Sequence, residues 1–178
     1  MPEPVIHPAA SAPDPETGAV LRRSVVPDID PRTLYLLAKL RQDVFTMEQK
    51  ATDPDLDGRD LEATTTLLWI EVPGPEAEAA GLEREPAAHI RVLHEPGGVL
   101  RIGRLAVRAA NRRDGFGRRI MRAALDVARE QAPQAEVHID AQAYLETWYQ
   151  SMGYETVGGL FMEAGIEHVP MVYRHPAD

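Results

Sequence analysis

Residues 101–121 read Arg101-Ile-Gly-Arg-Leu-Ala-Val-Arg-Ala-Ala-Asn-Arg-Arg-Asp-Gly-Phe-Gly-Arg-Arg-Ile-Met121, and this stretch decides the fold. Its first part belongs to a β-rich run over 99–107, and its last part opens an apolar stripe at helical spacing. That stripe consists of Ile120, Met121, Ala124, Leu125 and Ala128. The sequence therefore predicts a strand, a short Arg/Gly loop over 111–117, and a helix over 115–131.

The Arg/Gly loop leads into the start of a helix, and such a position favours anions. Backbone N–H groups of the first turn lack helical partners, and the helix dipole favours negative charge there. Gly115 and Gly117 leave room for a diphosphate, while Arg112, Arg113 and Arg118 can donate charge-assisted hydrogen bonds. Two better-known phosphate loops do not match, since the third glycine of the dinucleotide fingerprint and a Gly-Lys-Ser/Thr step are both missing.

Outward from this stretch, the pattern alternates between strands and helices. We expect strands over 21–26, 64–72, 87–94, 99–107, 137–141, 154–157 and 168–174, and helices over 31–48, 115–131 and 143–152. Asp30 and Pro31 supply the N-cap and first position of the first helix, and 73–86 is expected to be a loose hairpin connection. The order predicts one mixed α/β (α+β) domain over 21–178, after a flexible tail over 1–20.

Composition limits the function classes. The 178 residues include no cysteine, which excludes a disulfide framework, a thiol nucleophile and cysteine-ligated metal. The formal net charge of −9 argues against a general nucleic-acid binder. No apolar run is long enough to span a membrane and the N-terminus has no secretory pattern, so we expect a cytoplasmic protein. Eight arginines nonetheless lie close together in the sequence, and they could form either a solvated helix face or a binding site for a polyanion. They are Arg101, Arg104, Arg108, Arg112, Arg113, Arg118, Arg119 and Arg122.

A second motif accompanies the loop. The run Trp148-Tyr149-Gln150-Ser151-Met152-Gly153-Tyr154 follows after an intervening helix and strand. Together with the Arg-x-x-Gly-x-Gly loop of 112–117, it resembles the GNAT superfamily of acyltransferases. Segments 40–49, 55–60, 102–107 and 141–143 resemble its ElaA-like branch, so the resemblance covers roughly residues 34–174. It implies a mostly antiparallel central sheet flanked by helices.

The resemblance implies an acetyl-CoA or close acyl-CoA donor and an amine acceptor. Backbone groups of three strand residues would hold the pantetheine arm, and the loop would hold the pyrophosphate. The donor residues it implies are Leu105, Ala106, Val107, Arg112, Arg113, Asp114, Gly115, Phe116, Gly117, Arg118 and Gln142. It leaves acyl length, acceptor identity and a homodimer open.

The resemblance also implies catalytic roles. Tyr149 would protonate the departing thiolate, which suits a phenol because its ordinary pKa is about 10. Glu48 is the candidate general base, His138 and Asp140 are weaker alternatives, and a relay through ordered water stays open. From spacing alone, Tyr149 could equally be a core tyrosine.

The loop over 51–62 is acidic and is expected to border the acceptor cleft. It would attract a cationic acceptor such as a polyamine, an aminoglycoside-like amine or a lysine side chain. Its Asp53-x-Asp55-x-Asp57-Gly58 pattern resembles the start of a calcium loop, but Thr64 stands where a bidentate glutamate is needed, so we expect no metal. Two alternatives to the enzyme remain: a non-catalytic acyl-CoA sensor, and an acyl-homoserine-lactone-type synthase on the same fold.

Overall fold

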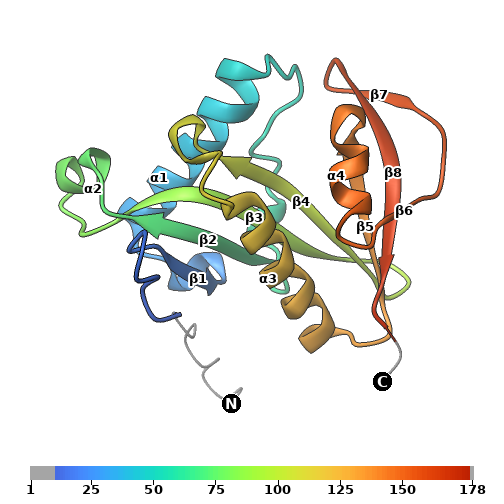
Figure 1. Ribbon diagram of the computed structural model, residues 1–178, viewed down its shortest axis with the longest axis horizontal. Coiled ribbons are helices and arrows are strands. Elements are labelled where there is room, and N and C mark those ends of the chain that lie inside the picture. Colours follow the sequence, from blue (N-terminus) through green and yellow to red (C-terminus); the bar gives the residue numbers. More distant parts are fainter. Residues whose placement is uncertain (1–10, 177–178) are drawn as a thin grey trace.

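The computed structural model describes residues 11–176, and its centre is an eight-stranded sheet (Figure 1). The strands follow the order β1-β2-β3-β4-β5-β8-β6, and β7 also pairs with β8. Their bounds are Val20–Ser24 (β1), Thr66–Val72 (β2), Glu85–Glu95 (β3), Val99–Val107 (β4), Glu136–Gln142 (β5), Glu155–Thr156 (β6), Phe161–Glu163 (β7) and Ile166–Arg174 (β8). Apart from the parallel β4–β5 pair, the ladders within residues 11–176 are antiparallel, which confirms the expected mixed, mostly antiparallel sheet.

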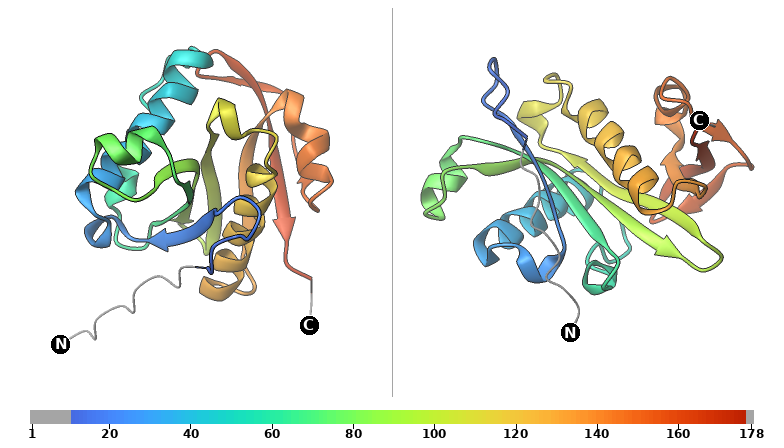
Figure 2. Two further views of the ribbon diagram at one scale, coloured as in Figure 1. Left: turned by 60° about the vertical axis from the view of Figure 1, so that its left-hand side comes forward. Right: turned by 90° about the horizontal axis from the view of Figure 1, so that it is seen from below.

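Helices cover both faces of the sheet. Helix α1 (Pro31–Arg41) packs on one face and α3 (Phe116–Gln131) on the other, as Figure 2 shows from below. The apolar stripe predicted for α3 is buried against the sheet, with Ile120 and Ala124 fully enclosed. Helix α3 is the longest described helix, and no helix within residues 11–176 is long and apolar enough to cross a membrane.

The helix predicted over 31–48 is present as two consecutive helical segments, α1 and a π-helical turn. Asp30 accepts hydrogen bonds from the backbone N–H groups of Arg32 and Thr33, so it is the N-cap. Beyond Arg41 the chain continues as a π-helical turn over Gln42–Glu48. Such turns are rare and recur at functional sites. This one places Glu48 at the mouth of the cleft described below.

The structure corrects three boundaries. The expected hairpin connection contains a short helix, α2 (Pro75–Ala79), whose Ala77 N–H donates to the buried Glu85 carboxylate at 2.9 Å. The last helix is shorter than expected, since a 3₁₀ turn precedes α4 (Glu146–Gln150). Strand β7 was not predicted, because Gly158 and Gly159 interrupt the pattern before it.

The expected tail lies partly outside the described residues, which begin at residue 11. Its described part lies against the domain: the Ser11 N–H donates to the Leu21 carbonyl at 3.2 Å, and Ala19 and Val20 are buried. Strand β1 therefore begins one residue before the expected domain boundary.

Strand β4, at the middle of the sheet, contains a bulge in its pairing with β3. The register against β3 moves from His89↔Ala106 to Arg91↔Gly103, so β4 carries one extra residue. Arg104 takes a positive φ of 56° there, and its carbonyl accepts a 3.0 Å hydrogen bond from His89 Nδ1. Burial, followed by the charge of Arg41, lowers the pKa of His89 to about 3, so this histidine is neutral. Pairing of β4 with β5 is confined to Leu100–Arg101 and 137–138, and the strands diverge beyond it (Figure 1).

Candidate active site

A cleft of about 990 Å³ opens where β4 and β5 diverge. Leu105 and Val107 of β4 form one wall, while Gln142 of β5 and Tyr149 of α4 lie on the other. Leu105 and Val107 are half-buried on the α3 side, whereas Ala106 is buried against Leu40 and Val44 behind the sheet. Past Arg101, no strand within residues 11–176 pairs with the edge of β4 that faces the cleft, so its backbone groups can pair with an extended ligand.

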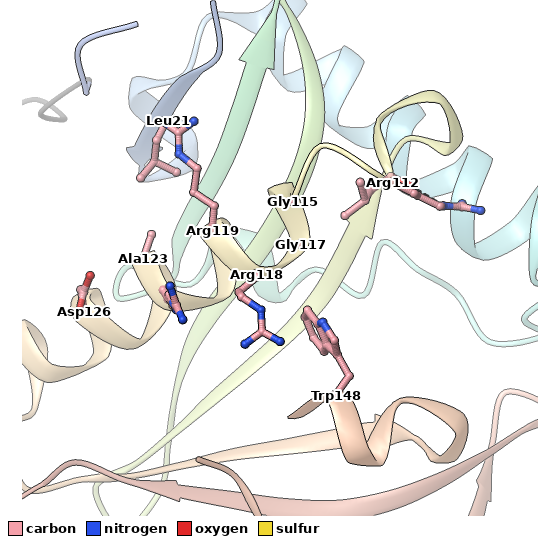
Figure 3. Close-up of a pocket in the computed structure, with 11 residues that line it drawn as sticks. Leu21, Arg112, Gly115, Gly117, Arg118, Arg119, Ala123, Asp126 and Trp148 are labelled. Atoms are coloured by element: carbon pink, nitrogen blue, oxygen red, sulfur yellow. Dashed lines mark hydrogen bonds between the residues drawn. The ribbon is translucent and has the colours of Figure 1, made fainter. Parts of the chain in front are cut away.

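The predicted anion loop lies at one end of this cleft. A second hollow of about 660 Å³ over the start of α3 shares Val107, Arg112, Gly117 and Trp148 with it (Figure 3). Gly115 has a φ of 73°, which favours glycine. Gly117 has no such requirement, since a Cβ there would lie at an ordinary 3.6 Å from Trp148 and 3.7 Å from Val107. The fold alone therefore does not explain a glycine at 117.

The other loop residues contribute mainly backbone. Phe116 is buried in the core, and the Asp114 carboxylate accepts a 2.8 Å hydrogen bond from Asn111 Nδ2. Their side chains are thus engaged in folding, and their N–H groups at the helix start are what an anion would meet.

The arginine cluster divides into two groups. Five of the eight each form an ion pair with a carboxylate, and they are Arg101, Arg104, Arg108, Arg112 and Arg119. Among residues 11–176, Arg113, Arg118 and Arg122 have no carboxylate partner. Arg118 instead donates to Ser151 Oγ at 2.8 Å and lies 5.9 Å from the Trp148 ring centre, toward which Figure 3 shows it pointing. Uncompensated positive charge therefore gathers at the N-terminal turns of α3.

Two residues assigned to different roles are ion-paired with each other. Arg112 was expected to hold the donor and Glu48 to act as base, yet an Arg112 Nη donates to the Glu48 carboxylate. Arg112 Nε also donates to the Val107 carbonyl at 3.3 Å. The pair lies across the junction of the two hollows, so Glu48 can accept a proton only after the pair opens.

Tyr149 lies in the middle of the cleft wall. Its ring is 7% exposed and forms edge contacts with Trp148 and Tyr154, at centroid distances of 4.8 and 5.7 Å. Its hydroxyl has no protein hydrogen-bond partner within the described residues. Burial, with a smaller effect of Tyr144, raises the pKa of Tyr149 well above its ordinary value, so the phenol keeps its proton.

Comparisons with known proteins agree with this geometry. A family model described as an acetyltransferase (GNAT) domain matches residues 76–175. A UPF0039 protein of Mycobacterium tuberculosis is 39% identical over 155 residues, covering 85% of this chain and 91% of that protein. ElaA of Escherichia coli is 32% identical over 141 residues, covering 78% and 85%. The chain belongs to the GNAT superfamily of acyltransferases.

Solved structures support the same assignment within that superfamily. An acyl-CoA N-acyltransferase from Pseudomonas aeruginosa superposes with a TM-score of 0.75 at 28% identity, over 86% of this chain and 97% of that one. The structure of Escherichia coli ElaA superposes with a TM-score of 0.74 at 27% identity, over 86% and 98%. The expected GNAT fold and the resemblance to the ElaA-like branch are both confirmed.

Gln142, expected near the donor of this GNAT protein, is held by neighbours across the cleft. Its Nε2 donates to Gln49 Oε1 at 2.9 Å, and its Oε1 accepts from the Tyr144 hydroxyl at 2.6 Å. Nearby, the Thr52 N–H donates to the Ala164 carbonyl at 3.3 Å, which joins the loop after Glu48 to the β7–β8 turn. These bonds enclose the end of the cleft opposite the anion loop.

Most carboxylates of the acidic loop are ion-paired within the fold, whereas the exposed Asp53, which lines the cleft, has no partner among residues 11–176. Asp55 and Asp60 pair with Arg41 at 2.8 and 3.0 Å, and Asp57 accepts two 2.8 Å bonds from Arg91. Both arginines are almost fully buried, so these carboxylates are partners within the fold. The calcium-like pattern has the same explanation, and within residues 11–176 no three His, Asp or Glu side chains gather as metal ligands.

The weaker base candidates are also engaged. Asp140 lines the cleft but pairs with Arg101 at 2.5 Å. His138 Nε2 lies 3.0 Å from Glu136, and His138 does not line the cleft. Sequence reasoning missed His168 and Glu163, which line the enclosed end. The sequence pattern predicted only that His168 lies on a strand, and it gave no reason to assign a function to His168 or Glu163.

Proposed function

We propose that this protein transfers an acetyl group from acetyl-CoA to a primary amine. The observation that carries the proposal is one continuous path. It runs from the cationic, glycine-containing start of α3, along the unpaired edge of β4, to the free hydroxyl of Tyr149. Phosphates, an amide-bearing arm and a thioester would meet matching groups in that order.

Each assigned residue has a role in this proposal. The N–H groups of 113–117, with Arg118, would hold the pyrophosphate, and backbone groups of 105–107 would hold the pantetheine arm. Arg112 would turn from Glu48 to the phosphates, because a doubly charged diphosphate competes well for its guanidinium. Glu48 would then be released as a candidate base at the cleft mouth. Gln142, fixed by Gln49 and Tyr144, would orient the donor beside Tyr149.

Transfer would occur by direct attack in a ternary complex. Holding amine and thioester in one cleft supplies much of the acceleration. Tyr149 would protonate the leaving sulfur, and its raised pKa means that the phenol still carries its proton when the thiolate forms.

The test is release of free CoA by the purified protein in a panel of primary amines, followed with a thiol reagent. Because the chain has no cysteine, CoA is the sole thiol in the assay. We also expect CoA to raise the melting temperature, since a ligand at about 100 times its Kd adds about 2.7 kcal/mol of stability. The donor assignment fails if CoA and acetyl-CoA leave that temperature unchanged.

The same assay separates the two alternatives. A sensor would bind CoA and release no thiol with any amine. An acyl-homoserine-lactone-type synthase would use a long acyl group on a carrier protein in preference to acetyl-CoA.

Replacing Gly117 by Glu is expected to weaken CoA binding by at least about tenfold. The new carboxylate would stand beside the diphosphate, and a like-charge contact costs several kcal/mol. Gly117→Ala is the matched control, since its Cβ meets only ordinary contacts in the free protein. Calorimetric titration with CoA measures both. Equal affinities for the Glu variant and the unchanged protein would show that the phosphates bind elsewhere.

A further inference from the structure

His168 is a buried histidine whose tautomer is set by the backbone. It lies on β8, is 7% exposed, and lines the enclosed end of the cleft. Its Nδ1 is 2.8 Å from the Ile166 carbonyl oxygen. A carbonyl can only accept, so Nδ1 carries the proton and the Nε2 of the neutral ring keeps a free lone pair. A base with a fixed orientation therefore lies inside the cleft.

Cross-strand pairing places His168 beside the donor machinery. His168 lies opposite Gln142 in the β5–β8 ladder, and directly paired residues project from the same face of a sheet. Gln142 and Tyr149 line the same cleft. The Phe161 ring packs over the imidazole at a centroid distance of 5.8 Å and an angle of 30°, which limits its rotation.

A carboxylate lies beside the free nitrogen of His168. Glu163 Oε2 is 4.0 Å from His168 Nε2, which is too far for a direct hydrogen bond, and both side chains line the cleft. Glu163 is half-exposed on β7 and has no arginine partner within residues 11–176. An acceptor ammonium that enters this end thus meets a negative charge and a lone pair together.

The other ionisable groups of the cleft are less available. Asp140 is paired with Arg101, and Asp55 and Asp57 are paired with arginines of the fold. Glu48, which donor binding would release from Arg112, and the unpaired Asp53 are both exposed, whereas His168 is buried. The Gln49–Gln142 and Thr52–Ala164 hydrogen bonds join the segments that line this end, so an amine bound there would lie against His168. It needs a proton acceptor within the cleft.

We propose that His168 is the general base of the reaction, and this rests on the function proposed above. His168 Nε2 takes one proton from the acceptor ammonium, and the freed nitrogen lone pair attacks the thioester carbonyl carbon. The new C–N bond is retained and the C–S bond breaks. The electron pair of the C–S bond goes to sulfur, and the sulfur then takes the proton of Tyr149. The nitrogen loses its second proton to the Tyr149 phenolate through water, and His168 returns its proton to solvent. One proton is released per turnover.

The first test compares two probe amines of similar size, ethylamine and 2,2,2-trifluoroethylamine, with saturating acetyl-CoA near neutral pH. Fluorine makes the second amine weakly basic, so it arrives without the extra proton. His168→Gln is expected to lower kcat for ethylamine about 10²-fold, the usual contribution of a positioned base, and for trifluoroethylamine no more than about threefold. Glu48→Gln tests the competing base and is expected to affect both amines alike, and a loss confined to ethylamine in that variant instead would overturn the inference.

Equal losses of kcat with both amines in a folded His168→Gln variant would give His168 a structural role and overturn the inference. No loss of kcat with ethylamine would overturn it as well.

A second measurement does not depend on turnover. Nitrogen NMR of ¹⁵N-histidine protein, with His168 identified from its missing signal in the variant, is expected to show the Nδ1–H tautomer. An Nε2–H tautomer would overturn the inference. If the unchanged protein acetylates neither amine while CoA still binds, the proposed function fails instead.

Discussion

Replacing Tyr149 by Phe is expected to lower kcat by about 10²–10⁴-fold, the contribution of a well-placed general acid. The change removes one hydroxyl and keeps the ring contacts with Trp148 and Tyr154. Because that hydroxyl bonds to no described protein group, its loss leaves no unpaired partner, and stability should change little. The affinity for acetyl-CoA should also change little, since the phenol acts on the departing sulfur.

Tyr154→Phe is the matched control for this prediction. Tyr154 is a buried tyrosine of the same aromatic cluster, but its hydroxyl donates to Met121 Sδ at 3.4 Å and it does not line the cleft. We expect near-normal kcat in that variant. Single-turnover kinetics with a good acceptor would measure both. A near-normal chemical rate in Tyr149→Phe would make Tyr149 a packing residue and require another proton source.

The raised pKa of Tyr149 sets the expected pH dependence. Burial shifts the pKa upward, so the acid form is complete below the ordinary tyrosine pKa of about 10 and is lost only at higher pH. No decline of kcat that is due to Tyr149 should therefore appear up to about pH 10. Above it the unfolded state gains from ionising this tyrosine, so stability falls, and circular dichroism alongside the rate profile would show unfolding.

The sequence points to a donor half of the site more directly than to an acceptor half, for a physical reason. The donor loop is local: Gly115, Gly117 and the arginines around them lie within one strand–loop–helix unit, so spacing alone specifies their proximity. Tyr149 could be recognised only because a second motif stood in the right order. The β4 bulge at Arg104 depends on pairing with β3, and the hydrophobic pattern of the sequence gives no sign of it.

The acceptor half depends on contacts between distant segments. Two contacts at this end join residues about a hundred positions apart, Gln49 with Gln142 and Thr52 with Ala164. The sequence of one segment does not indicate that it contacts the other. The resemblance to the ElaA-like branch made Glu48 a candidate base, yet its ion-pair partner Arg112 comes from the donor loop, which the sequence did not indicate. Acidity of the 51–62 loop suggested attraction for a cation, because composition cannot tell a solvated carboxylate from one paired with a buried arginine.

Asp60→Ala is expected to destabilise the protein by about 3 kcal/mol, the low end of the cost of breaking a buried ion pair. Asp60 bridges two arginines, accepting from Arg41 at 3.0 Å and from Arg91 at 3.1 Å. Their side chains are only 3% and 4% exposed, so each would keep its charge and lose one acceptor. For a domain of this size the melting temperature should fall by about 6–12 °C.

Asp53→Ala is the control, because Asp53 lies in the same loop, is exposed, and pairs with no described residue; it should stay within about 0.5 kcal/mol. Burial alone would raise the pKa of Asp60, but Arg41 and then Arg91 outweigh it and lower the pKa. A lowered carboxyl pKa stabilises the fold above the ordinary value of about 4, and this stabilisation is lost as pH falls through the folded-state pKa. The difference in the free energy of unfolding between the unchanged protein and Asp60→Ala, measured by urea unfolding, should therefore become smaller below about pH 4. A gap under about 1 kcal/mol at neutral pH would mean that water solvates both arginines and that the loop carboxylates are free to meet an acceptor after all.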